Sequence, residues 1–445
     1  MARLIIGHIT DSSVKIWVRG ENSHPWANLT IFEGVNALKT IQLELEERHG
    51  YTGCIEVKSL NANIRYTCQV LFGKDKNTKQ HLMIDFGHCR GHFITAPAPT
   101  TEIGIQPFSF LLGSCNLHSL GLLQSPDNAY ETLINRTVQS DVKFMIHCGD
   151  QIYYDIPNFL KTPDINEYRQ KYLDAWQDCR PARLFLTQLP HYMILDDHEI
   201  VDNFSNDMYV KGWAATPQQF KDIAMKAYRE FVHIRHPTFD NQSYHYKFNY
   251  GQIHFFVLDT RTERWSNRSN GANQIIGQEQ LLRLKTWLKE NKNAIKFIVS
   301  SVPFVAEVRH SDDKWNADIF RHQREEIIEF IVKNKVKNIT FLTGDMHNSY
   351  YAKMTIKAAE QISTIHELMS SPINQIAKSS IDQYDLTGVA KTSSNGVVYQ
   401  SSIDKSSFYN DHSNAMLIKV YPDQIKWEIF RAKNNKTDKK GNFTL

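Results

Sequence analysis

Residues 142–155 read VKFMIHCGDQIYYD, and this stretch decides the fold class. An apolar run ends at Gly149, and two carboxylates and two tyrosines follow it within six residues. Glycine followed by aspartate is turn chemistry that ends a strand, but a turn alone does not need the tyrosines. Because ligands gather at the carboxyl ends of strands in α/β sheets, the stretch predicts a buried strand that delivers Asp150 and Tyr153 to a site.

Four further strand-like runs end in polar residues that can bind metals. These residues are Ser114, Cys115 and Asn116 after FSFLLG, Asp196, Asp197, His198 and Glu199 after HYMIL, Asp259 and Arg261 after HFFVL, and Asp345 and His347 after ITFLTG. Helical patterns over residues 217–232, 277–290 and 320–333 lie between the strands. Strands that alternate with helices predict a layered α/β domain, so we expect these side chains to form one site at the edge of its sheets.

A different pattern precedes this domain. From Leu4 to about Thr95 the chain alternates in short β-type runs, which predicts an all-β sandwich of immunoglobulin or fibronectin type. Two prolines in FITAPAPTTE then mark a boundary over residues 96–102. We therefore expect a β-sandwich domain over 1–98, an α/β domain over 103–432 and a solvated basic tail over 433–445.

Composition excludes several classes of protein. The 445 residues carry a formal net charge of +3, which is too balanced to indicate a nucleic-acid or membrane partner. No apolar stretch approaches the roughly 20 residues of a membrane span, and no signal peptide is visible, so the sequence predicts a cytoplasmic protein. The six cysteines are expected to be free thiols at this chain length. Nothing in the sequence indicates the oligomeric state.

The acidic cluster that begins at Asp196 predicts a metal site. Asp196, Asp197 and Glu199 surround His198 after a buried strand and would repel one another without a cation. Carboxylates with histidine, tyrosine and cysteine suit hard or borderline cations, and more than one of them. A phenolate ligand favours ferric iron, because an unperturbed tyrosine has a pKa near about 10. Two adjacent metals would clamp a phosphoryl group and activate a bridging water, which predicts a phosphoester hydrolase.

The blocks GSCN, HCGDQIYYD, LDDHEIVDNF, LDTRTER, LTGDMHNSYY and ELMSSPIN occur in this order behind the β-rich segment. As a set they resemble the PhoD-type alkaline phosphatases of the metallophosphoesterase superfamily, which is related to the purple acid phosphatases. The resemblance implies a four-layer α/β sandwich that holds Fe3+ and Ca2+, with Zn2+, Mn2+ or Mg2+ as alternatives in the second site. It also implies hydrolysis of phosphate monoesters or diesters by a metal-bridging hydroxide.

The resemblance assigns a role to each matching residue. Asp150 would bridge the two metals, Cys115, Tyr153 and His347 would bind iron, and Asp197 and Asp345 would bind the second metal. His198 would face the phosphate and assist the leaving oxygen, and Arg261 would hold the phosphate oxygens. The strand in IKFIVSSVPF ends without the further histidine that the superfamily often has.

Several assignments stay open at this stage. Asp196, Asp202 and Asn203 are alternative ligands, and His118 is a weaker candidate for a ligand or a substrate contact. His147 and Tyr154 are expected to pack rather than to react. Substrate selection is expected in loops over residues 158–168 and 265–273. The rival functions are a phosphodiesterase or nuclease that acts on nucleotides or lipid head groups and, with less support, a binding or scaffold protein without turnover.

Overall fold

The fold was determined as a computed structural model of the whole chain. It describes residues 4–77, 89–99, 104–117, 119–120, 123–124, 128–158, 162–178, 180–209, 214–240, 242–268, 272–377 and 380–445. The expected strand HLMIDFG, the end of the expected domain boundary, Cys179 and His118 lie outside these residues. The other five cysteines are free thiols, as expected.

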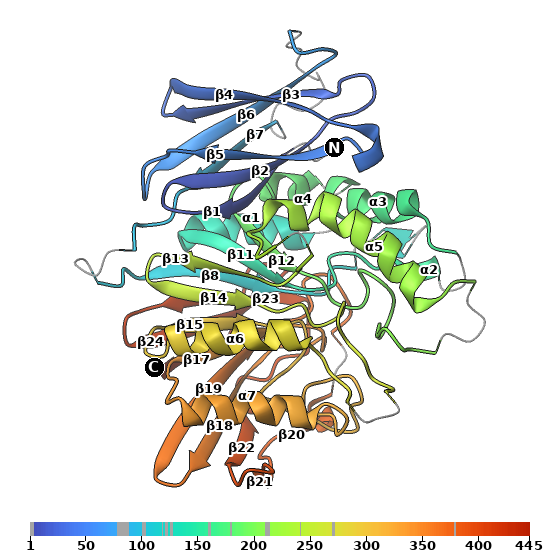
Figure 1. The fold of residues 1–445 in the computed structure, drawn as a ribbon. Coiled ribbons are helices and arrows are strands. Elements are labelled where there is room, and N and C mark those ends of the chain that lie inside the picture. The colour runs from blue at the N-terminus through green and yellow to red at the C-terminus, as the bar shows by residue number, and fades with distance from the viewer. Residues whose placement is uncertain are drawn as a thin grey trace.

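The first part of the chain forms two antiparallel sheets, drawn in blue at the top of Figure 1. Their strands are β1 (Leu4–Ile9), β2 (Ser13–Arg19) and β5 (Thr52–Lys58) in one sheet, and β4 (Asn36–Glu44), β3 (Trp26–Glu33), β6 (Arg65–Gly73) and β7 (Arg90–Ile94) in the other. A short 3-10 helix, η1 (Glu47–His49), precedes β5. Buried and exposed positions alternate along β5 and β7, as in a two-layer sandwich with one face outward.

The rest of the described chain builds two larger mixed sheets. The six-stranded sheet has the order β12 (His191–Ile194), β11 (Val142–Cys148), β8 (Phe108–Gly113), β23 (Asn414–Val420), β24 (Gln424–Arg431), β25 (Thr437–Thr444). The eight-stranded sheet has the order β13 (Tyr246–Tyr250), β14 (Ile253–Val257), β15 (Lys296–Val299), β17 (Ile339–Thr343), β19 (Gln361–Met369), β18 (Tyr350–Ala358), β22 (Val398–Ile403), β21 (Lys391–Thr392). Two-stranded ribbons pair β9 (Ser119–Leu120) with β10 (Leu123–Gln124) and β16 (Glu307–Val308) with β20 (Tyr384–Asp385).

Seven α-helices accompany these sheets in the described residues. They are α1 (Asn128–Gln139), α2 (Asp155–Asn158), α3 (Ile165–Leu173), α4 (Arg180–Phe185), α5 (Pro217–Phe231), α6 (Gln278–Glu290) and α7 (Arg321–Lys333), with the short helical turns η2 (Asp174–Asp178), η3 (His233–Arg235) and η4 (Ile381–Gln383). The three longest helices agree with the expected ones. Helix α5 begins where its sequence predicts, because Thr216 forms a capping box with Gln219 and Pro217 occupies the first turn.

The two large sheets pack face to face through aromatic side chains. Phe110 and Phe144 of the six-stranded sheet contact Phe255 of the other sheet, with ring centroids 5.8 and 5.6 Å apart. The outer faces are covered by helices: Leu111 and Met145 pack with α1 and α4, and Phe256 packs with α6. Figure 1 shows α6 and α7 on the outside of the eight-stranded sheet. This helix–sheet–sheet–helix order is the expected four-layer α/β sandwich.

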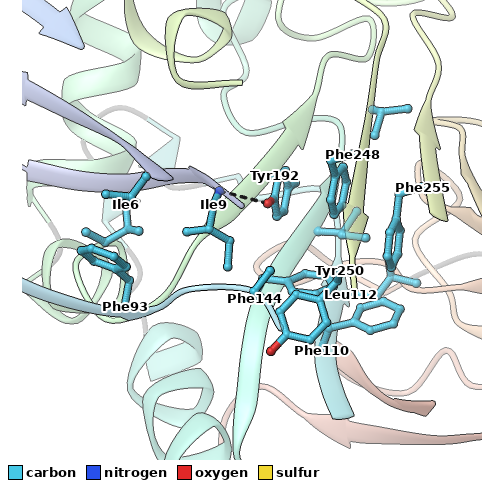
Figure 2. Packing of buried hydrophobic residues seen from close by; sticks show 14 of the residues in the cluster. Ile6, Ile9, Phe93, Phe110, Leu112, Phe144, Tyr192, Phe248, Tyr250 and Phe255 are labelled. Atoms are coloured by element: carbon cyan, nitrogen blue, oxygen red, sulfur yellow. Dashed lines mark hydrogen bonds between the residues drawn. The ribbon is translucent and has the colours of Figure 1, made fainter. Parts of the chain in front are cut away.

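The N-terminal sandwich shares this core instead of standing apart from it. Figure 2 shows Ile9 of β1 beside Tyr192, which lies in turn against Phe248. The Tyr192 hydroxyl accepts a hydrogen bond from the Ile9 backbone amide at 3.3 Å, and its ring stacks on Phe248 at 3.7 Å. The two parts are therefore joined by one continuous cluster of buried apolar side chains.

Two expectations about local structure are wrong. Residues 433–445 do not form a solvated tail, because β25 pairs along the whole of β24 and Phe443 stacks on His366 at 4.1 Å. Only Phe443 of its eight residues is buried, so the sequence TDKKGNFT of this edge strand lacks an apolar pattern. The expected loop over residues 158–168 is partly helical, since α2 ends at Asn158 and α3 begins at Ile165.

Buried histidines make the fold sensitive to acid. His147, His191 and His236 are all fully buried, and His147 Nε2 lies 3.0 Å from His191 Nδ1. Burial lowers the pKa of His191 to about 3 and lowers the pKa values of His147 and His236 well below the usual range. The folded state therefore keeps these rings neutral, while the unfolded chain takes up protons below pH 6.5 or so.

The contribution of these neutral histidines to the free energy of unfolding is therefore expected to be fully present above about pH 6.5. It should decrease as the pH falls towards 3. Between pH 6.5 and pH 5, each buried histidine is expected to lower the free energy of unfolding by up to about 2 kcal/mol. Urea unfolding at pH 7.5 and pH 5 measures the loss, and His191→Gln should flatten the dependence relative to a His310→Gln control at an exposed site. An equal pH dependence in His191→Gln and the wild type would contradict this account.

Candidate metal centre

The polar residues predicted from the strand ends lie together at one edge of the two sheets. Strands β8, β11 and β12 are parallel neighbours, as are β14, β15, β17 and β19, so their carboxyl ends share an edge. Two groups of residues lie there, and the potential ligand atoms of each group are within 4.8 Å of one another. Asp150 belongs to both groups. The groups consist of Cys115, Asp150 and His347, and of Asp150, Asp197 and His198.

Asp150 lies at the centre of the cluster. Its Oδ2 is 3.2 Å from Cys115 Sγ and 3.3 Å from the Tyr153 hydroxyl, so the expected bridging carboxylate meets two of the expected iron ligands. Its Oδ1 is buried and has no hydrogen-bond partner among the described residues. Burial raises the pKa of Asp150 well above the usual range, and the neighbouring Cys115 adds to the rise. A buried carboxylate oxygen without a donor fits a cation.

Cys115 and Tyr153 need a positive charge in order to ionise. Burial raises the pKa of Cys115 to about 12, although the Ser371 hydroxyl donates a hydrogen bond to its sulfur at 3.1 Å. Burial and the charge of Asp150 raise the pKa of Tyr153 well above 10. A bound metal ion reverses this preference, because it stabilises the thiolate and the phenolate directly. The donor set therefore fits a strongly charged cation.

A second carboxylate group extends the site. Asp196, Asp197 and Asp345 also bring ligand oxygens within 4.8 Å of one another. Burial would raise the pKa of Asp197, but the charge of Arg261 outweighs it and lowers the pKa to about 2. Asp196 differs, since burial raises its pKa to about 6 despite Arg261, and its Oδ2 has no hydrogen-bond partner within the described part of the chain. Three carboxylates with oxygen donors only suit a hard cation such as Ca2+.

Unusual backbone conformations aim these ligands. Cys115, Asp150, Asp345 and His347 have positive φ angles of 57°, 56°, 76° and 51°, which residues other than glycine seldom adopt. Strain of this kind persists where the surroundings over-determine it, typically at functional sites. Gly149 has a φ of 88°, and a Cβ there would lie 2.4 Å from Asp196 Cβ. Gly149 is therefore needed for two reasons: its positive φ angle forms the turn, and the absence of a side chain leaves room for Asp196.

His198 is held by a carboxylate that sequence reasoning left unassigned. Its Nδ1 lies 2.8 Å from Asp155 Oδ1, and its Nε2 is 3.9 Å from Asp202 Oδ1. Burial lowers the pKa of His198, but the charges of Asp197 and Asp150 outweigh burial and raise it well above 6.5. The ring also lies over Tyr153 with centroids 4.1 Å apart. His198 is therefore held in one orientation beside the cluster, and its side chain is 16% exposed.

Arg261, expected to hold the phosphate oxygens, belongs to a buried ion-pair network in the structure. Its side chain is fully buried, its Nε donates to Asp196 Oδ1 at 2.5 Å, and its two terminal nitrogens donate to Asp313 at 2.8 and 3.1 Å. Contact with a substrate phosphate would require this arginine to leave two carboxylates. In this geometry Arg261 supports Asp196, and its contact with a substrate phosphate stays a prediction.

Glu199 holds two of the ligand-bearing turns together. Its carboxylate accepts hydrogen bonds from the backbone amides of Asp150, Gln151 and Asp196, at 3.0, 2.5 and 2.7 Å. Its position in the acidic run was visible in the sequence, but its partners were not. Carboxylates that accept several backbone amides fix loops in place.

The open assignments are placed as follows. Asp202 is 56% exposed, and Asn203 uses its backbone amide to donate to Asp197 Oδ2 at 2.7 Å. His147 pairs with His191, and the Tyr154 ring stacks on Tyr168 at 3.5 Å, so both pack as expected. The expected second substrate loop, 265–273, contains an isolated bridge between Trp265 and Gln274, and residues 269–271 are outside the described part.

A family model described as PhoD-like phosphatase matches residues 110–429. The chain belongs to the PhoD-like phosphatase family. The match covers all the residues of the cluster described above and excludes the N-terminal sandwich and β25.

Individual relatives agree with the family assignment. This PhoD-like chain is 25% identical over 375 residues to alkaline phosphatase D of Bacillus subtilis (strain 168), which is 75% of this chain and 60% of that protein. The match thus spans less than two thirds of that relative's length. A structure of PhoD superposes with a TM-score of 0.72 at 17% identity, covering 100% of this chain and 89% of that one.

The purple acid phosphatase PPD1 from yellow lupin (Lupinus luteus) seeds superposes with a TM-score of 0.61 at 11% identity. That match covers 99% of this PhoD-like chain and 74% of the lupin protein. Both structural matches support the metallophosphoesterase fold, including its β-rich N-terminal part.

Proposed function

We propose that this chain is a metal-dependent phosphoesterase that hydrolyses phosphate esters. One observation carries the proposal: two groups of metal-competent ligands share the buried Asp150, at the edge where parallel strands of both sheets end. Membership of the PhoD-like phosphatase family supports the same activity. No helix in the described residues is long and apolar enough to cross a membrane.

The donor set supports Fe3+ in one subsite and Ca2+ in the other. Cys115, Asp150, Tyr153 and His347 would hold the ferric ion, because thiolate and phenolate ligands favour a strong Lewis acid. Asp150, Asp197 and Asp345 would hold the second ion, with Asp196 alongside. When bound, such a pair of ions polarises the phosphoryl oxygens and supplies a nucleophile at neutral pH.

The protein's own groups then position the ester and move a proton. Asp155 fixes His198 through Nδ1, so the Nε2 proton points away from Asp155 and towards the mouth of the cluster. His198 is therefore the group that donates this proton to the departing alkoxide. Arg261 holds Asp196 in place and, through Asp313, ties the second subsite to the segment after β16.

Nitrophenyl phosphate and its bis ester distinguish the possible substrates. Purified protein loaded with Fe3+ and Ca2+ is expected to hydrolyse the monoester with the higher kcat/KM. A much higher kcat/KM for the bis ester would instead identify a phosphodiesterase. If protein with full metal content hydrolyses neither ester, the proposal is refuted. The alternative of a binding or scaffold protein would then be favoured.

Direct iron analysis tests the ferric subsite separately. Iron bound by a phenolate gives a visible charge-transfer colour, which Tyr153→Phe should remove. Metal content together with the absorption spectrum checks this without any substrate. Colourless, iron-free protein would refute the phenolate assignment while leaving the hydrolase proposal open to the ester assay.

A further inference from the structure

A lysine outside the sequence-predicted site lies at its mouth. Lys314 is in the segment between β16 and α7, and its Nζ lies 2.7 Å from Asp313 Oδ2. The same ammonium forms an ion pair with Asp345, one of the expected ligands of the second metal. The side chains of Lys314 and Asp345 are 11% and 16% exposed, whereas Arg261 is fully buried. Lys314 is thus a cation of this network that solvent reaches.

The charges around Lys314 are unevenly matched. Asp313 is shared by three cations, because Arg261, Arg264 and Lys314 all donate to its carboxylate. Burial would raise the pKa of Asp313, but these three charges outweigh it and hold the pKa far below the usual range. Arg261 also pairs with Asp196 and Asp197, and Lys314 pairs with Asp345, so these three cations face four carboxylates in the absence of metal ions.

Bound metal ions would change this balance of charge. Once Asp196 and Asp345 face bound cations, their negative charge no longer balances Arg261 and Lys314. Arg261 is fully buried, and its donors are already directed at Asp196 and Asp313. Lys314 has three N–H donors, and Asp313 and Asp345 are its two carboxylate partners, which leaves one donor for an anion at the mouth.

The segment that carries Lys314 is anchored to the sheet. The Ser311 hydroxyl accepts hydrogen bonds from the backbone amides of Asp313 and Lys314, at 3.3 and 3.1 Å. The next residue, Trp315, is fully buried and its indole donates to Ser300 at the end of β15, at 3.2 Å. Side chains held in this way can meet a ligand at little entropic cost.

The geometry points to Lys314 as the residue that contacts the substrate phosphate: its ammonium donates a hydrogen bond to a phosphoryl oxygen beside the second metal subsite. This inference rests on the proposed phosphoesterase function and moves the role expected of Arg261 to a residue of the same ion-pair network. Lysine suits the task as a point charge with rotatable donors.

Inorganic phosphate is the probe that tests this role. Its dissociation constant is measured by isothermal titration calorimetry on wild type, Lys314→Met and Lys314→Arg, each loaded with Fe3+ and Ca2+ to the same measured content. Lys314→Met is expected to weaken phosphate binding by about 10- to 100-fold, the effect of losing a charge-assisted hydrogen bond. Lys314→Arg keeps the charge and should recover part of the loss.

The matched control is Lys391→Met. Lys391 also pairs with a carboxylate, Glu307, at 2.6 Å, but it lies on β21 outside the cluster. Its removal should leave the phosphate affinity unchanged. Thermal unfolding of each variant establishes that it folds, and Lys314→Gln, which retains a donor, replaces Lys314→Met for the same comparison if the methionine variant does not fold.

Two results would overturn the inference. Unchanged phosphate affinity in Lys314→Met would exclude the contact. Unchanged phosphate affinity with tighter Ca2+ binding would show that Lys314 only occupies the place of the second cation. Failure of the proposed function looks different: wild type would bind phosphate, and Lys314→Met would bind it more weakly, while neither nitrophenyl ester was hydrolysed.

Discussion

Asp150→Ala is expected to abolish metal loading and to lower kcat/KM for phosphate esters by about 1,000-fold or more. Asp150 belongs to the ligand group with Cys115 and His347 and also to the group with Asp197 and His198. Its Oδ2 contacts both Cys115 Sγ and the Tyr153 hydroxyl. Removal of this side chain therefore separates the two subsites. Metal content by elemental analysis and ester hydrolysis check the two effects independently.

A stability measurement separates this role from a structural one. Without metal, the buried Asp150 carboxylate has one oxygen with no partner, which destabilises the fold. Metal-free Asp150→Ala should therefore unfold at the same urea concentration as metal-free wild type, or a higher one. Asp222→Ala, at an exposed position of α5, serves as the control with normal metal content. An Asp150→Ala variant that keeps both metals and activity would refute the bridging role.

Glu199→Ala is expected to lower the free energy of unfolding by about 3 kcal/mol or more. Three backbone amides, those of Asp150, Gln151 and Asp196, would lose their acceptor inside the protein. A buried donor left without an acceptor costs about 1–3 kcal/mol. Because both turns carry metal ligands, the variant should also bind metal more weakly, which urea unfolding and metal titration measure separately.

Glu199→Gln and Glu279→Ala complete the comparison. The glutamine keeps one oxygen acceptor, so its loss of stability should be smaller than that of the alanine variant. Glu279 is 69% exposed and pairs with Arg283 on the surface of α6, so its removal should cost less than 1 kcal/mol. A Glu199→Ala variant as stable as Glu279→Ala would show that the three amides find other acceptors.

Much of the fold follows from strand patterns that are local in sequence. The runs at β8, β11, β12, β14, β15 and β17 are buried throughout or nearly so, as parallel strands covered on both faces must be. Edge strand β25 escaped prediction because only Phe443 of its eight residues is buried. Its pairing with β24 depends on backbone hydrogen bonds, which do not require an apolar pattern.

The site was predictable where residues follow strands directly. Cys115, Asp150, Asp197, Asp345 and His347 all follow a strand by one to four residues, and the sheets bring them together. Lys314 and Asp313 follow no large-sheet strand, and the sequence RHSDDKW is typical of a solvated loop. The direction of a side chain is likewise absent from the pattern, so the sequence does not show that the guanidinium of Arg261 pairs with Asp196 and Asp313.

Anomalous diffraction at the iron absorption edge from crystals of the protein grown with Ca2+ tests the central claim most directly. The account predicts an iron peak bonded to Cys115, Asp150, Tyr153 and His347, with a second, non-iron metal on the Asp197 and Asp345 side and Asp150 between them. A metal-loaded crystal with no peak beside Asp150, or with its metals bound elsewhere, would contradict it.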